Sequence, residues 1–284
     1  MRFVKGHGTE NDFVVLPPGE VADLDAGLVR ALCDRRAGVG ADGVLRVVDR
    51  TVDIAAADGL EDAGPAGDVR WFMDYRNADG SVAEMCGNGI RVFARYLVTA
   101  GLARPGTLRI STRAGVKSVE VAPAGDVSVD MGPAERRPDA KVVVDGAAYD
   151  AVGWSMGNPH LVVTDADLDS LDLSVAPAVD PPAGYPHGVN VEFVTRVGPC
   201  HIRMRVHERG VGETRSCGTG ACAAAVAVMA AAGERTSYDV DVPGGRLVVT
   251  WHDDGRVTLA GPAVLVATGE YPGDPRATAV SPSG

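Results

Sequence analysis

The stretch that most constrains this chain is residues 221–232, which carry no polar side chain except the thiol of Cys222. The run predicts a helix, and Gly233 follows it where a C-terminal cap glycine belongs. Such a helix is apolar on every side and is shorter than the ~20 residues that cross a bilayer, so it must be enclosed by protein. We therefore expect a sheet curled around it.

The seven-residue motif at the start of this helix occurs twice. Its copies are Glu84-Met85-Cys86-Gly87-Asn88-Gly89-Ile90 and, 131 residues later, Arg215-Ser216-Cys217-Gly218-Thr219-Gly220-Ala221. After the first copy, apolar residues at helical spacing predict a second helix with one apolar face; they are Ile90, Phe93, Ala94 and Leu97. Unpaired N–H groups at a helix start favour negative charge, so a thiolate or a bound carboxylate should be stabilised at both places.

The repeat predicts two halves of similar design, which agrees with the two domains that 284 residues suggest. Each half should be a rolled mixed or antiparallel sheet around a buried helix, an α+β fold. The expected halves are 1–130 and 131–262, with 263–284 returning to the first. Expected strands in the first half are 3–5, 12–16, 43–48, 69–75, 107–111, 116–121 and 127–131, with a helix at 25–33. Those in the second are 141–144, 151–155, 161–164, 189–195, 201–207, 238–242, 246–251 and 257–259.

Four further local expectations follow from composition. Residues 55–68, rich in Gly and Asp and without a period, predict an exposed, mobile loop, and the Pro-, Gly- and Ser-rich residues 271–284 predict a disordered tail. Residues 132–138 predict the crossing between the halves. Cys33 and Cys200 are expected to be buried as small hydrophobic residues.

The charge and the N-terminus limit the partners. A formal net charge of −11 argues against nucleic acid or an anionic membrane, because both require basic patches. The first residues lack the apolar run of a signal peptide, which predicts a cytoplasmic protein, and no stretch is long enough to span a membrane. Five irregularly spaced cysteines do not make a disulfide framework. The expected partner is therefore a small molecule.

Three uses of Cys86 and Cys217 compete. A redox disulfide is disfavoured because dithiol redox motifs place the second cysteine at Cys-x-x-Cys. A metal site is disfavoured because neither motif supplies a second metal ligand at the spacing that metal sites use. The third use is acid–base catalysis by two thiols, one from each half. One thiol would remove a proton from one face of a carbon while the other donates a proton to the opposite face.

The remaining polar residues suit an amino-acid ligand. Five asparagines adjoin Gly, Pro or a strand end, where a side-chain amide can bind either end of a zwitterion, although a turn-forming role is the ordinary alternative for each. They are Asn11, Asn77, Asn88, Asn158 and Asn190. Glu208 and Arg209 end a predicted strand and could pair with an ammonium and a carboxylate; a surface ion pair is their alternative.

The sequence resembles the diaminopimelate epimerases over nearly its whole length. The matching motifs, in the family's order, are Gly6-His7-Gly8-Thr9-Glu10-Asn11-Asp12-Phe13, Asn77-Ala78-Asp79-Gly80-Ser81, Cys86-Gly87-Asn88-Gly89, Ser155-Met156-Gly157-Asn158-Pro159-His160, Val206-His207-Glu208-Arg209-Gly210 and Gly212-Glu213-Thr214-Arg215-Ser216-Cys217-Gly218-Thr219-Gly220-Ala221-Cys222. The resemblance implies cofactor-independent interconversion of LL- and meso-2,6-diaminopimelate, in lysine and cell-wall precursor synthesis. A proline-racemase-like isomerase, a phenazine-biosynthesis-like isomerase and a non-enzymatic binding protein are the alternatives.

The resemblance also implies roles for residues. Cys86 and Cys217 match the two acid–base residues, with no cofactor and no metal. The positions that match substrate-binding residues are Asn11, Asn77, Gly87, Asn88, Asn158, Asn190, Glu208, Arg209, Gly218 and Thr219, and those that match thiol-tuning residues are His160 and Glu208. A homodimer is left open. Many members carry Gln where this chain has Gly43, so the contact that this Gln makes is missing or supplied by another group.

Overall fold

The computed structural model describes residues 1–52 and 69–273, so the expected loop at 55–68 and the last residues of the tail lie outside the described residues. The chain divides into two compact units by its own contacts. Unit 1 comprises Met1–Gly8, Asp12–Ala124 and Ala263–Gly284, and unit 2 comprises Thr9–Asn11 and Gly125–Pro262.

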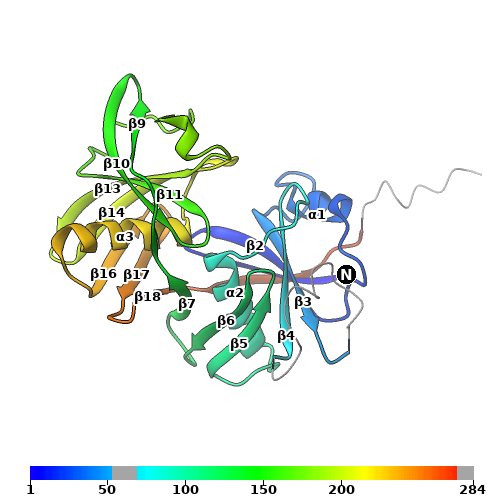
Figure 1. Cartoon of the computed structure of the whole chain (residues 1–284). Helices are drawn as coiled ribbons and strands as arrows, with labels where there is room; N and C mark the ends of the chain where they lie inside the picture. Colours follow the sequence, from blue (N-terminus) through cyan, green and yellow to red (C-terminus); the bar gives the residue numbers. More distant parts are fainter. Residues whose placement is uncertain (53–68, 274–284) are drawn as a thin grey trace, which may run out of the picture. The chain divides into compact units, whose positions relative to one another are not determined.

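Unit 1 is a mixed sheet with one enclosed helix (Figure 1). Its elements are β1 (Arg2–Gly8), β2 (Asn11–Leu16), α1 (Ala26–Cys33), β3 (Gly43–Asp49), β4 (Trp71–Asn77), α2 (Gly87–Thr99), β5 (Gly106–Thr112), β6 (Gly115–Val121) and β19 (Val264–Glu270). β2 pairs with β3 and β4 with β5 in parallel, whereas β1–β19, β3–β4 and β5–β6 are antiparallel. β19 follows residue 262 and pairs with β1 within unit 1.

Helix α2 is more enclosed than its sequence pattern predicted. It packs against β1, β3, β4, β6 and β19. All its residues from Gly87 to Leu97 are buried, including the side chain of Arg91, which is 0% exposed. Arg91 lies inside because its guanidinium donates to the Gly87 carbonyl at 3.1 Å and to Asn88 Oδ1 at 2.9 Å, which offsets the cost of removing it from water.

Unit 2 is built in the same way around α3 (Gly218–Ala232), drawn in yellow in Figure 1. Its strands are β7 (Val127–Pro133), β8 (Glu135–Arg136), β9 (Ala140–Val144), β10 (Ala147–Ser155), β11 (Pro159–Thr164), β12 (Ala178–Asp180), β13 (Asn190–Gly198), β14 (His201–Glu208), β15 (Gly212–Thr214), β16 (Ser237–Val242), β17 (Gly245–Trp251) and β18 (Arg256–Gly261), with a 3₁₀ turn at Pro182–Gly184. Helix α3 contacts β10, β11, β13, β14, β16, β17 and β18, and it is buried up to Met229. Gly233 caps it with a φ of 71°, which confirms the expected enclosed helix and its stop.

Parallel pairing recurs at the same place in both units. In unit 1, Phe13 lies opposite Gly43 where β2 runs parallel to β3. In unit 2, His160 lies opposite Asn190 where β11 runs parallel to β13. The α+β class with a sheet around each buried helix is therefore confirmed.

Several local expectations were wrong or incomplete. Strand β7 was expected to close the first half, but it pairs with β18 of unit 2. Cys33 is buried as expected, whereas Cys200 is exposed, because it occupies a turn with a φ of 49° between β13 and β14. The crossing region contains the short strand β8, and β12 and β15 were not predicted, because two or three residues are too few to show a pattern.

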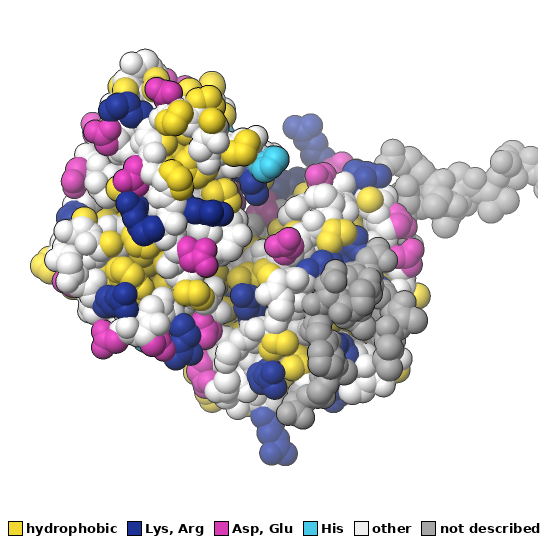
Figure 2. All heavy atoms as spheres, viewed as in Figure 1, with side chains coloured by type: hydrophobic (Ala, Val, Ile, Leu, Met, Phe, Trp, Pro, Cys, Tyr) yellow, Lys and Arg dark blue, Asp and Glu magenta, His cyan; other side chains and the backbone are white. Residues whose placement is uncertain are grey.

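Acidic and basic side chains alternate over the face seen in Figure 2 and do not gather by sign. Among the helices at residues 1–52 and 69–273, none is both long and apolar enough to cross a membrane.

Candidate active site

Cys86 is the N-cap residue of α2. Its backbone is extended, with φ −137° and ψ 123°, and its Sγ accepts a hydrogen bond from the Gly89 N–H at 3.4 Å. This geometry directs the sulfur to the open N–H groups of the helix start, as the sequence predicted. The side chain is half-buried.

The other unit 1 candidates lie at two places. Gly87 and Asn88 form the first turn of α2, where Asn88 is buried against Arg91. Asn77 ends β4, and its side chain donates to Ser81 Oγ at 3.0 Å. Asn11 starts β2, within the short stretch that belongs with unit 2.

Gly8 allows the N-terminal motif to approach α2. A Cβ at Gly8 would lie 3.1 Å from the Asn88 carbonyl oxygen and 3.0 Å from the Arg91 guanidinium. A larger residue would push the loop away from the helix start, so this glycine has a packing reason. Gly43 is more confined than Gly8, because a Cβ there would lie 2.6 Å from the Arg76 carbonyl oxygen. In this structure position 43 therefore has no room for a Gln side chain.

Cys217 is the N-cap residue of α3 and repeats the geometry of Cys86. Its backbone is extended, with φ −121° and ψ 115°, and its Sγ accepts from the Gly220 N–H at 3.4 Å. Cys217 is buried. The preceding Ser216 is held by Thr9, whose Oγ1 lies 2.6 Å from Ser216 Oγ, and both hydroxyls are buried. Glu10 pairs with Arg215 next to them, so the loop at residues 9–11 holds the motif around Cys217 in place.

A chain of hydrogen bonds joins four of the unit 2 side chains to Cys217. Thr219 Oγ1 lies 3.5 Å from Cys217 Sγ and accepts from Asn158 Nδ2 at 3.3 Å. Asn158 Oδ1 lies 3.0 Å from His160 Nε2, and His160 Nδ1 lies 2.7 Å from Glu192 Oε1. The structure therefore brings Asn158, His160 and Thr219 together with Cys217.

Glu208, Arg209 and Asn190 lie at the adjoining strand ends. Asn190 Oδ1 accepts from the Arg209 backbone N–H at 2.9 Å, and its Nδ2 donates to the Pro159 carbonyl at 3.3 Å. The Arg209 guanidinium donates to the His187 carbonyl at 3.2 Å, and Glu208 accepts a hydrogen bond from the Thr214 hydroxyl. Gly218 is the first residue of α3.

The electrostatics of this site oppose the expected thiolate. Burial raises the pKa of the Cys217 thiol well above its usual value, and the carboxylates of Glu208 and Glu192 raise it further. The hydrogen bonds from Thr219 and from the Gly220 N–H lower this pKa by less. The helix-start N–H therefore lowers the pKa of Cys217 as expected, but loss of hydration and two carboxylates outweigh this effect.

Burial also raises the pKa of the Glu208 carboxyl, and the negative charge of Glu192 adds to this effect. Hydrogen bonds from Thr214 and Cys217 oppose it. The pKa values of the Glu208 carboxyl and of the Cys217 thiol beside it are therefore both raised.

Glu192 is a residue that sequence reasoning missed. It is 0% exposed, and among the described residues its Oε2 has no hydrogen-bond partner. No signal in the sequence marked it, because Val189-Asn190-Val191-Glu192-Phe193 alternates between apolar and polar residues, a pattern that predicts a strand with one face in solvent. In the structure β13 is buried on both faces from Asn190 to Val194, so a charged side chain there is a candidate for a buried functional group.

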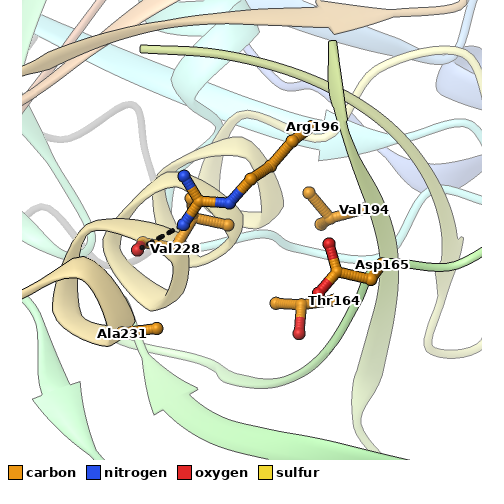
Figure 3. Close-up of a pocket in the computed structure, with 6 residues that line it drawn as sticks. All are labelled: Thr164, Asp165, Val194, Arg196, Val228 and Ala231. Carbon is orange, nitrogen blue, oxygen red and sulfur yellow. Dashed lines mark hydrogen bonds between the residues drawn. The ribbon is translucent and has the colours of Figure 1, made fainter. Parts of the chain in front are cut away.

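A small pocket lies elsewhere on α3 and is shown in Figure 3. Its lining residues are Thr164, Asp165, Val194, Arg196, Val228 and Ala231. The Arg196 guanidinium donates to the Val228 carbonyl at 3.2 Å. Val228 is roughly three helical turns from Cys217, so this pocket is not part of the cysteine site. In the described ranges, no three His, Cys, Asp or Glu side chains are arranged to hold a metal ion.

Solved structures share this fold at low sequence identity. A phenazine biosynthesis protein of the PhzF family from Bacillus anthracis aligns with a TM-score of 0.65 at 17% identity, covering 95% of this chain and 98% of its own. A probable proline racemase from Agrobacterium radiobacter K84 aligns with a TM-score of 0.66 at 15% identity, covering 96% and 93%. These two structures therefore share the fold class of this chain, in which each unit wraps a sheet around a buried helix.

Sequence comparison identifies the family within that class. The family model described as "Diaminopimelate epimerase" matches residues 3–137 and 153–266. The diaminopimelate epimerase of Streptomyces coelicolor is 54% identical over an alignment of 279 positions, which covers 95% of this chain and 94% of that protein. That of Acidothermus cellulolyticus is 50% identical over an alignment of 290 positions, gaps included, which covers 94% of each chain. The chain belongs to the diaminopimelate epimerase family, as its motifs predicted.

Proposed function

We propose that this protein interconverts LL- and meso-2,6-diaminopimelate by proton transfer at the α carbon, with Cys86 and Cys217 as the two acid–base residues. The observation that carries the proposal is the duplicated N-cap cysteine: each sulfur sits at the start of an enclosed helix, in a member of this family. Inversion of a carbon centre needs one group that takes a proton and another that gives one, and two such thiols supply both.

We further infer which thiol gives the proton in the resting protein. Burial and two carboxylates favour the protonated form of Cys217, so Cys217 is the donor and Cys86 is the base in that direction. The proton taken from the α carbon then resides on Cys86, and the S–H proton of Cys217 moves to the opposite face of the carbanion. In the reverse direction the roles exchange, so that the count of protons on the two sulfurs is preserved.

The substrate-binding roles belong to the same proposal. The side-chain amides, the first-turn N–H groups and the pair Glu208–Arg209 can bind the carboxylate and ammonium groups of a diamino diacid. The residues proposed for this are Asn11, Asn77, Gly87, Asn88, Asn158, Asn190, Glu208, Arg209, Gly218 and Thr219. His160 and Glu208 are proposed to tune the thiols. No cofactor is proposed.

The proposed setting follows from the substrate. A small charged amino acid requires neither nucleic acid nor membrane, and its use in lysine and peptidoglycan precursor synthesis implies a cytoplasmic enzyme. We propose that the two halves are the pseudo-symmetric domains of this enzyme, with β7 in the second half and residues 263–284 joining the first. We also propose that the protein forms a homodimer, which light scattering of the purified protein would test by measuring its molar mass.

The test is conversion of pure LL-diaminopimelate, followed by chiral separation of the isomers. The protein should produce the meso isomer, and Cys86→Ala and Cys217→Ala should each abolish the conversion. Cys200→Ser is the matched control, because Cys200 is exposed in a turn, and it should keep wild-type activity. Binding of the substrate without conversion would favour a binding protein and overturn the proposal.

A further inference from the structure

The two cysteine motifs have similar backbone geometry, but different side chains pack against them. In unit 1, a Cβ placed on Gly89 would lie 3.3 Å from Leu45 Cδ2 and 3.4 Å from Phe13 Cζ. In unit 2, a Cβ placed on the equivalent Gly220 would lie 2.6 Å from Glu192 Oε1. Apolar side chains therefore pack against the start of α2, whereas a carboxylate occupies the matching place at the start of α3.

The strand registers show that these contacts come from equivalent positions. Phe13 lies opposite Gly43 in unit 1, as His160 lies opposite Asn190 in unit 2. Two residues further along, Leu45 on β3 corresponds to Glu192 on β13. The apolar pair Phe13 and Leu45 is therefore replaced in unit 2 by the hydrogen-bonded pair His160 and Glu192, both 0% exposed.

We propose that Glu192 is a positioning residue that holds Cys217 in its protonated form and thereby makes the two thiols unequal. The position and the contacts of its carboxylate support this role. Glu192 Oε1 and Cys217 Sγ both lie close to the same point beside Gly220, the sulfur at 3.3 Å from the Cβ position. A carboxylate at such short range, away from water, opposes a second negative charge on the sulfur.

Glu192 is also held in place for this role. His160 Nδ1 fixes one of its oxygens, and the ring continues through Asn158 to Thr219 and the sulfur. Glycine at position 220 is what allows the carboxylate to reach the helix start, because any side chain there would meet Oε1.

The other groups around Cys217 either also raise the pKa of its thiol or affect that pKa less than the two carboxylates do. Glu208 on β14 also raises the pKa of the thiol, and it does so more strongly than Glu192. Thr219 and the Gly220 N–H lower it by less than either carboxylate. The guanidinium of Arg209 is directed to the His187 carbonyl, and Arg215 pairs with Glu10. Removing the charge of Glu192 should therefore make Cys217 more acidic even if it disturbs the Thr219 hydrogen bond.

The experiment measures how fast each cysteine reacts with iodoacetamide as a function of pH, with the Cys86 and Cys217 peptides quantified separately by mass spectrometry. Glu192→Gln should shift the Cys217 profile to lower pH and raise its alkylation rate below the midpoint about 3- to 10-fold, since the thiolate is the reacting form. The Cys86 profile serves as the internal reference and should not move. Glu234→Gln is the matched control, because Glu234 binds the Tyr238 hydroxyl beyond the far end of α3, and it should leave both profiles unchanged.

A second variant covers a Glu192→Gln protein that does not fold. Glu192→Asp keeps the charge but withdraws it by one methylene from Gly220, so it should shift the Cys217 profile in the same direction by less. An unchanged or upward-shifted Cys217 profile in folded Glu192→Gln or Glu192→Asp protein would overturn the proposal.

The proposal rests on the proposed function for its catalytic meaning, but alkylation does not need turnover. A protein that shows the predicted shift and fails to convert diaminopimelate would overturn the proposed function alone. A protein that converts diaminopimelate and shows no shift would overturn the role of Glu192 alone.

Discussion

His160 and Glu192 form a 2.7 Å hydrogen bond between Nδ1 and Oε1, and neither side chain is exposed to solvent. Breaking a buried pair by removing one partner leaves the other polar group unsatisfied. His160→Phe alone should therefore lower the free energy of unfolding by about 3 to 5 kcal/mol.

The double variant His160→Phe, Glu192→Leu copies the apolar pair of unit 1 and should lose less stability than the two single variants together. We expect a coupling energy of about 1 to 3 kcal/mol in urea denaturation at neutral pH. Additive losses would show that the two side chains do not depend on each other.

Replacement of Glu208 should separate stability from activity. A carboxyl whose pKa is raised in the folded protein costs stability above its unfolded pKa of 4.5, and the cost grows as the pH rises through the folded value. Glu208→Gln should then raise the Tm by about 2 to 4 °C at pH 8 and by less near pH 4. Epimerase activity should fall at least about tenfold, because a charged hydrogen-bonding group is lost from the proposed site. A lower Tm at pH 8 would show that Glu208 is stabilised in the fold by contacts that need its charge.

Asp12 should contribute to stability in the opposite pH range. Burial raises its pKa, but hydrogen bonds from Arg35 and Lys5 outweigh this effect and lower the pKa to about 2. The ion-pair distances are 2.7 Å to Arg35 and 2.5 Å to Lys5. A lowered pKa gives stability that is present above the unfolded value of 3.8 and is lost as the pH falls toward 2.

Asp12→Asn should therefore lower the free energy of unfolding by about 1 to 2 kcal/mol at pH 7, a value reduced because Arg35 is largely exposed. The difference from wild type should shrink between pH 4 and pH 2. Denaturation curves at several pH values measure this, and a constant difference across that range would contradict the ion-pair account.

Serine variants test the division of labour between the thiols. Cys86→Ser and Cys217→Ser keep the shape but replace a thiol by a far weaker acid, so each should nearly abolish epimerisation. Elimination of a leaving group from a halogenated substrate analogue needs one base only, so each variant should still act on the analogue whose stereochemistry suits its remaining cysteine. Opposite preferences are expected. The same preference in both variants, or near wild-type epimerisation by either, would contradict the two-base mechanism.

Much of the fold could be predicted because its helices carry unambiguous local signals. The apolar run before Gly233 allowed only an enclosed helix, and Asp25 caps α1 by accepting from the N–H groups of Gly27 and Leu28. The partner of β7 could not be predicted, since a strand's composition does not say which distant strand it joins. Cys200 was misjudged because its exposure depends on the turn that follows β13, whereas its residue type favours burial.

The candidate site was predicted in residue type but not in electrostatics. The two cysteines and their positions at helix starts could be predicted from the Cys-Gly-x-Gly motif. The raised pKa of the Cys217 thiol could not, because it arises from burial and from the carboxylates of Glu208 and Glu192, which lie on the strands β14 and β13. The departure at Gly43 is also explained only by packing, since the Arg76 backbone occupies the space that a side chain would need.

The most direct test of the central claim is exchange of the α proton with solvent. LL-diaminopimelate is incubated with the protein in deuterated water, after dialysis against a chelator and without added cofactor, and deuterium at the α carbon is followed by mass spectrometry and proton NMR. The account predicts that each molecule converted to the meso isomer carries solvent deuterium at the inverted centre, and that Cys86→Ala and Cys217→Ala abolish this conversion. Formation of the meso isomer without deuterium uptake, or a requirement for added metal or pyridoxal phosphate, would contradict it.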